Sequence, residues 1–170
     1  MQRRRGLATV WLILSLPMLL AALCLTVDVG KLWVERAALE NAVEAATLAA
    51  VRQWNDDGAK LDSRSDIVSA VQEAVAYAQA NLVDGQGLEL SDRVSGRVRF
   101  EFGCIIEGRF HPNVAPNCGR GWRPAVRIAV TDFPITSACG QQWSYSVSAQ
   151  SLAVAECSGP IRLFTPTVEP

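Results

Sequence analysis

Residues 7–27 read LATVWLILSLPMLLAALCLTV and carry no charged side chain over 21 positions. A membrane-spanning helix needs about 20 apolar residues to cross a hydrocarbon core of about 30 Å. Eleven of the 21 residues are Leu, Ile or Val. Together they favour insertion by about 5 kcal/mol, which outweighs Pro17 and three hydroxyl-bearing residues. The stretch therefore predicts a transmembrane helix that begins at Leu7 and ends at Val27.

The flanks of this run predict its orientation. The arginines at positions 3–5 precede it, and basic residues in a short flank stay on the cytoplasmic side. Asp28 follows it, so we expect residues 1–6 in the cytoplasm and the rest of the chain outside. Trp11 and Trp33 are spaced for the two interfacial aromatic belts. The run is longer than the apolar region of a signal peptide, so we expect an uncleaved anchor.

The charge balance bears on the class of partner. The 170-residue chain has a formal net charge of −1. Three of its 16 basic residues precede the apolar run, which leaves 13 basic against 17 acidic residues. A nucleic-acid-binding surface would be strongly basic. We therefore expect no nucleic-acid partner.

Five cysteines divide between the anchor and the outer portion. Cys24 lies in the apolar run and is interpreted as a small apolar residue. Cys104, Cys118, Cys139 and Cys157 are an even number in a compartment where disulfides persist. We predict two bridges between neighbours, Cys104–Cys118 and Cys139–Cys157, although four cysteines allow three connectivities.

Residues 28–54 predict a continuation of the helix, because Ala, Leu, Glu and Arg dominate them. Lys31 with Glu35, and Arg36 with Glu40, are spaced for ion pairs one turn apart. With the anchor this gives a rod of about 45 residues and about 68 Å that holds a head away from the membrane. Alanines on every face leave two interpretations open, packing against helices of an assembly or burial in the chain's own domain.

Residues 62–165 predict an α+β head, followed by a short tail, 166–170. A second helix begins near Ser63 or Ser65, and its apolar face predicts packing on a sheet. That face consists of Ile67, Val71, Ala74, Val75, Ala78 and Leu82.

Beyond Leu88 the apolar residues alternate with a period of two, which indicates strands. We expect strands at 94–102, 125–130, 143–155 and 161–164, with a loop at 107–121. Leu152 and Val154 follow a polar stretch, which suggests a bulge or burial on both sides. Strands joined without helices predict a small antiparallel sheet.

No catalytic constellation is present. The chain has no G-x-S-x-G, H-E-x-x-H, P-loop or C-x-x-C motif. Its only histidine, His111, has the wrong surroundings for a zinc site. We therefore expect no enzyme activity, cofactor, metal or small-molecule substrate. A basic–aromatic group leaves two interpretations open, partner binding or solvated charges, and consists of Arg120, Trp122, Arg123 and Arg127. Asp28 likewise has two candidate partners, Lys31 or a neighbouring subunit.

Three features of the first 50 residues form one pattern. Gly6 follows basic residues, Asp28–Val29–Gly30 follows the apolar run, and residues 39–50 read LENAVEAATLAA. This pattern resembles the TadE/TadG-like family of the tight-adherence (Tad, or Flp) pilus system, a branch of the type IV pilus-like machines. The positions that match are Asp28, Gly30, Leu39, Asn41, Ala42, Ala45, Ala46 and Leu48.

One departure concerns processing. TadE-type pseudopilins are cut after a glycine that Glu follows five positions later, whereas Trp11 follows Gly6 here. This favours the TadG-like branch. The resemblance implies a minor pilin-like or assembly component of a pilus or secretion machine, with its N-terminal helix in contact with lipid and other subunits. It also implies a bacterial inner-membrane anchor and a periplasmic or extracellular head. The alternative is a membrane-tethered ligand-binding or sensor module.

Overall fold

The computed structural model describes residues 5–90, 97–139, 144–156 and 161–163, with only the backbone placed for residues 5–9 and Cys118. Several predicted features lie outside the described residues. They are the basic flank at 1–4, the start of the first strand at 94–96, Trp143, Cys157, Phe164 and the tail at 166–170.

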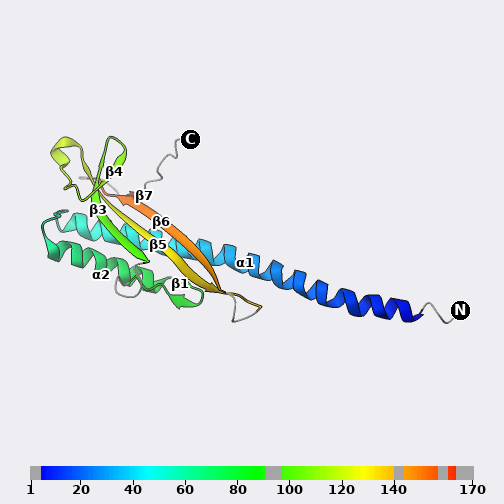
Figure 1. The fold of residues 1–170 in the computed structure, drawn as a ribbon. Coiled ribbons are helices and arrows are strands. Elements are labelled where there is room, and N and C mark those ends of the chain that lie inside the picture. Colours follow the sequence, from blue (N-terminus) through cyan, green and yellow to red (C-terminus); the bar gives the residue numbers. More distant parts are fainter. Residues whose placement is uncertain (1–4, 91–96, 140–143, 157–160, 164–170) are drawn as a thin grey trace.

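One helix, α1 (Arg5–Asp56), runs through both the apolar segment and the Ala-rich segment, for 52 residues. It passes Pro17 without interruption and is about 78 Å long at 1.5 Å per residue. Its first half projects alone from the rest of the molecule (Figure 1). The helix ends where Gly58 adopts a φ of +92° and the amide of Ala59 donates to the carbonyl of Trp54. The predicted continuous helix is confirmed.

A five-stranded antiparallel sheet has the order β4-β3-β5-β6-β7. Its strands are β3 (Val98–Ile106), β4 (Arg109–Pro112), β5 (Arg123–Thr136), β6 (Ser144–Val154) and β7 (Arg162–Leu163). A separate hairpin joins β1 (Leu82–Val83) to β2 (Gln86–Gly87). The α+β class and the antiparallel sheet are confirmed.

The stretch predicted as a loop, 107–121, contains strand β4 and a short 3-10 helix, η1 (Cys118–Arg120). Glu107 and Gly108 have φ values of +49° and +78°, as a two-residue hairpin turn requires. At Gly103 on β3, an added Cβ would clash with the carbonyl oxygen of His111 on β4. The prediction of a plain loop was wrong because β4 has only 4 residues, too few to show a period of two in the sequence.

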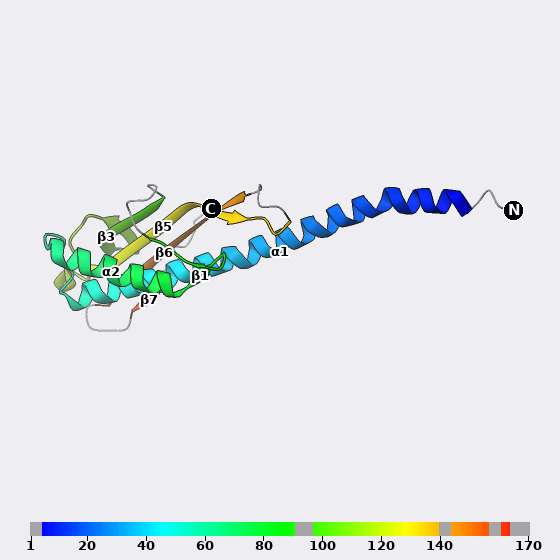
Figure 2. The same ribbon diagram turned by 90° about the horizontal axis from the view of Figure 1, so that it is seen from below.

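Two helices cover one face of the sheet (Figures 1 and 2). The second, α2 (Arg64–Ala80), follows Ser63 as predicted and packs mainly along α1. Its buried residues are Ala70, Ala74 and Ala78, while Ile67, Val71 and Val75 pack against the edge of the core. Leu82 was placed on the buried face wrongly: it lies in β1 and is 64 % exposed.

The second half of α1 lies in the core of the head. Leu39, Val43, Val51 and Trp54 are completely buried there. The Trp54 ring meets the Phe102 ring of β3 edge to face, with centroids 5.2 Å apart. Of the two interpretations of the Ala-rich segment, the structure therefore supports burial in the chain's own domain.

The open face of the sheet carries a smaller apolar cluster of Ile105, Ala125, Leu152 and Val154, with Phe110 packed against it. This cluster explains why β6 is buried on both sides at its end, one of the two predicted alternatives. The bulge is on the partner strand β5, between Val130 and Phe133.

The two predicted disulfides are not found among the described residues. Cys104 and Cys139 carry free thiols. Cys104 is buried in the centre of the sheet, opposite His111 of β4 and Pro124 of β5. The two predicted bridges are therefore unsupported, and their other members, the Cys118 side chain and Cys157, lie outside the described residues.

Candidate functional site: the stem–head junction

The exposed apolar half of α1, residues 10–27, is called the stem here. The strands β5 and β6 run back along α1 until the segment between them reaches Asp28, directly after the stem (Figure 1). The head therefore begins where the apolar run ends. The prediction of a rod that holds the head away from the membrane was wrong, because the β5–β6 hairpin returns along the helix.

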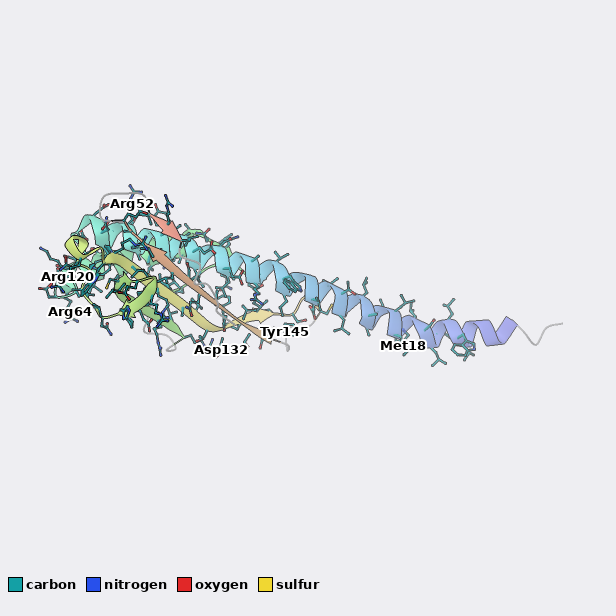
Figure 3. The ribbon with its side chains drawn as sticks, turned by 90° about the horizontal axis from the view of Figure 1, so that it is seen from above. Met18, Arg52, Arg64, Arg120, Asp132 and Tyr145 are labelled. Atoms are coloured by element: carbon teal, nitrogen blue, oxygen red, sulfur yellow. The ribbon has the colours of Figure 1, made fainter. Side chains whose placement is uncertain are left out.

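Asp28 is the centre of this contact. Its carboxylate accepts hydrogen bonds from Ser137 Oγ and the Ala138 amide, both at 2.7 Å, and a longer one from the Tyr145 hydroxyl at 3.4 Å. Figure 3 places Tyr145 beside α1. The bond from Ser137, with the others, lowers the pKa of Asp28 against the opposing effect of burial. The predicted pairing of Asp28 with Lys31 is not found: Asp28 bonds to the head of the same chain, and Lys31 pairs with Asp84.

Lys31 makes a second contact on the same face of α1. Its Nζ atom lies 2.8 Å from Asp84 Oδ1 and donates to the carbonyl of Thr136 at 2.7 Å. The hydrogen bond to Asp84 is the main reason why the pKa of Lys31 is raised. The bond from Lys31, and then the Thr136 amide, lower the pKa of Asp84. Both groups are thus held in their charged forms.

Glu35 completes the arrangement by accepting a hydrogen bond from the Asp84 amide at 2.6 Å. The predicted Lys31–Glu35 ion pair is thus replaced by contacts of both residues with Asp84. The predicted pair of Arg36 and Glu40 is confirmed, at 2.9 Å.

These contacts form one polar cluster, called the stem–head junction. Its members are Asp28, Lys31, Glu35, Asp84, Thr136, Ser137, Ala138 and Tyr145. The α1 members recur at steps of three and four residues, so they share one face of the helix. The arrangement fixes the rotation of α1 relative to the head.

The backbone presents Asp84 to α1 through a tight turn. Asp84 and Gly85 have φ values of +51° and +74° and form the two-residue turn between β1 and β2. The sequence marks this Asp-Gly pair as a turn. It gives no sign that Asp84 meets Lys31, because 53 residues separate them and no local period links them.

The family-motif residues divide into two groups in the structure. Asp28 lies in the junction, whereas Leu39, Ala42 and Ala46 are buried in the core. Ala45 and Leu48 are half-buried, and Gly30 and Asn41 are exposed. The structure gives no contact that requires Gly30 or Asn41.

The stem exposes almost its whole surface. Its large apolar side chains are between 48 % and 78 % exposed, with Met18 the most exposed (Figure 3). By length and composition α1 is a candidate membrane span, the one such helix among the described residues. Trp11 and Trp33 are both 68 % exposed, so neither contributes to the head's core.

The predicted basic–aromatic group is split. Arg120 stacks over Trp122, with 5.5 Å from its guanidinium carbon to the ring centroid. Arg127 instead pairs with Glu101 on the open face of the sheet and stacks over Phe110. Arg123 lies opposite Ile105 of β3, on the same face of β5 as Arg127.

Two further features bear on ligand binding. Within the described parts of the chain, no three His, Cys, Asp or Glu side chains gather as metal ligands would. A hollow of about 390 Å³ lies between the β1–β2 hairpin and the ends of β3 and β5, beside the bulge. Asp84, Glu89 and Arg97 are the charged residues among its lining.

Most of α1 is similar to a known protein family. Residues 6–53 match the family described as "Putative Flp pilus-assembly TadE/G-like". Searches of curated proteins and of solved structures give no significant match. The matched segment covers the stem, the α1 side of the junction and the buried part of α1 up to Gln53. The resemblance of this N-terminal segment to the TadE/TadG-like pilus-assembly family is thereby confirmed.

Proposed function

We propose that the chain is a minor pilin-like or assembly component of a tight-adherence pilus or secretion machine. In this proposal, residues 7–27 anchor it in the bacterial inner membrane, the N-terminus is cytoplasmic and the head lies outside. The family match over residues 6–53 carries the proposal. The role is structural and not enzymatic.

The surface of the stem supports a membrane location. An apolar surface of this extent is unfavourable in water and is expected to be covered by lipid or by other helices. The polar side chains within it bond to their own helix, with Ser15 donating to the Leu12 carbonyl and Thr26 to that of Ala22. Such bonding is what a hydrocarbon environment requires of hydroxyl groups.

The junction supports a structural role. Because α1 is shared by the stem and by the core of the head, no flexible linker separates the two parts. The junction braces the helix at the border between them. A subunit that contacts the stem would therefore set the position of the head as well.

The first test is membrane attachment and sidedness. The full chain should stay with membrane vesicles during alkaline carbonate extraction, and protease added to spheroplasts should digest the head. Release of the intact chain by carbonate would overturn the anchor, and protection of the head in spheroplasts would overturn the orientation.

The second test concerns the machine. Deletion of the encoding gene should reduce Flp pili on the cell surface, and a tagged chain should co-purify with the pilus-assembly platform. An Asp28→Ala variant should remain in the membrane and fail to restore piliation fully. Normal piliation after deletion would contradict the role in assembly.

A membrane-tethered ligand-binding module is the second candidate. The hollow of about 390 Å³ beside the β1–β2 hairpin favours it, since its size suits a small ligand. An Arg97→Ala variant would then lose the ligand while pili form normally.

A further inference from the structure

Two cysteines from distant parts of the chain lie together at the stem–head junction. Cys24 precedes Asp28 by four residues, so it lies on the same face of α1, one turn closer to the N-terminus. Cys139 follows Ala138, whose amide donates to Asp28 at 2.7 Å. The hydrogen bonds of Asp28 therefore bring the segment that carries Cys139 against the turn that carries Cys24.

Cys24 lies near enough to the Cys139 thiol to be the main cause of its raised pKa. Cys24 is half-buried, whereas every other described residue from 10 to 27 is exposed. The segment that follows β5, residues 137–139, reaches α1 next to this position and accounts for the burial of Cys24.

The backbone around Cys139 is held in place. The Ser137 hydroxyl accepts a hydrogen bond from the Cys139 amide at 3.1 Å and donates its proton to Asp28 at 2.7 Å. Ser137 and Ala138 both bond to Asp28, and Ser137 also holds the Cys139 amide. The segment that carries Cys139 is therefore held against the turn of α1 that follows Cys24.

We propose that Cys24 and Cys139 are a disulfide-forming pair that ties the head covalently to the stem at the end of the apolar run. Because it uses Cys139, the bond excludes the Cys139–Cys157 bridge expected from the sequence. It depends on the geometry of the junction and not on the assignment to pilus assembly.

The reaction needs an oxidant, and an organic or protein disulfide is the chemical class that fits. The thiolate of exposed Cys139 attacks one sulfur of the oxidant, and the oxidant's other sulfur leaves as a thiolate. The Cys24 thiolate then attacks Cys139 Sγ in the mixed disulfide and releases the second thiol. The two cysteines lose two electrons and two protons, and the oxidant is reduced to two thiols.

The pair should oxidise faster at higher pH. The contact with Cys24, and then burial and the nearby Asp28 carboxylate, raise the pKa of Cys139 to about 11. The titratable groups that face it are Cys24 and Asp28 on α1 and Tyr145 on β6. Because the thiolate is the nucleophile, the rate should rise about tenfold per pH unit below this pKa.

The test uses the full chain in detergent micelles, reduced and then exposed to oxidised glutathione. After alkylation of free thiols and digestion without reductant, mass spectrometry should find the peptide of Cys24 joined to that of Cys139 in the monomer. The matched control, Cys104→Ser, should form the same bond, whereas Cys24→Ser should leave Cys139 alkylated. Asp28→Ala should slow formation several-fold, because it releases residues 137–139 from α1.

Other products would overturn the proposal. They are a Cys24–Cys24 bond between two chains, a bond from Cys139 to Cys118 or Cys157, or alkylation of both Cys24 and Cys139 after prolonged oxidation. An unchanged rate in Asp28→Ala would overturn the part assigned to the junction.

Discussion

Trp54 offers a sharp test of the conclusion that α1 belongs to the core of the head. Its side chain is completely buried, and its ring meets Phe102 edge to face at 5.2 Å. Its Nε1 donates only a long hydrogen bond of 3.4 Å to the Lys60 carbonyl, so packing dominates its contribution. Replacement of a buried Trp by Ala costs about 3–5 kcal/mol, and the aromatic pair places Trp54→Ala in the upper part of that range.

The assay is thermal unfolding of the full chain in detergent micelles, followed by circular dichroism. For a head of this size, each kcal/mol lowers the midpoint by about 2–4 °C, so Trp54→Ala should lower it by about 10 °C or more. The matched control is Trp33→Ala, because Trp33 is 68 % exposed on the same helix. We expect it to change stability by less than about 0.5 kcal/mol. Equal effects of the two substitutions would refute the placement of Trp54 in the core.

Three further predictions follow from the same helix. A fragment of residues 28–170 should fold, whereas one of residues 62–170 should give no dispersed amide NMR spectrum. The shorter fragment lacks the four completely buried α1 side chains named above, whose burial contributes about 6–12 kcal/mol. A folded 62–170 fragment would contradict the core assignment. Gly30→Ala should raise the free energy of unfolding in chemical denaturation by about 0.5–1 kcal/mol, because Ala has the better helix propensity and an added Cβ meets nothing within 4 Å. A loss of stability would mean that a neighbour occupies this face of α1. The pKa of Asp28 is lowered in the folded protein. Its contribution to the stability of the fold is therefore present at pH values above its ordinary pKa of 3.8 and is lost as the pH falls through the folded-state pKa. Hydrogen exchange at the Ala138 amide, corrected for intrinsic rate, should therefore show protection near neutral pH that disappears below about pH 3.8, and protection that persists in strong acid would contradict this reasoning.

Local patterns in the sequence predicted the elements well. The uncharged run and the Ala-rich segment gave one helix, and alternation at 98–102 and 125–130 gave two neighbouring strands. These features depend on periods of two or 3.6 residues, which neighbouring positions reveal directly. Strand β4 was missed although Glu107–Gly108 marks its turn, because four residues are too few to show a period.

The contacts that define the candidate site could not be predicted in the same way. Asp28 meets Ser137 and Tyr145 across 109 and 117 residues. No local pattern carries a pairing over that distance, because it depends on how far the β5–β6 hairpin returns along α1. The disulfide prediction used closeness along the chain, whereas the segment that carries Cys139 reaches α1 only through the hairpin.

The unbroken helix connects membrane attachment to the orientation of the head. A helix turns by about 100° per residue, so the face that carries Asp28 and Lys31 is fixed relative to every residue of the stem. Gly30, a residue of poor helix propensity, lies between these two braced positions. A rotation of the stem at Gly30 would therefore break the bonds of Asp28 with the head while those of Lys31 remain. Because the junction opposes that rotation, a subunit that bound one side of the stem, as the proposed function requires, would determine which face of the sheet the head presents.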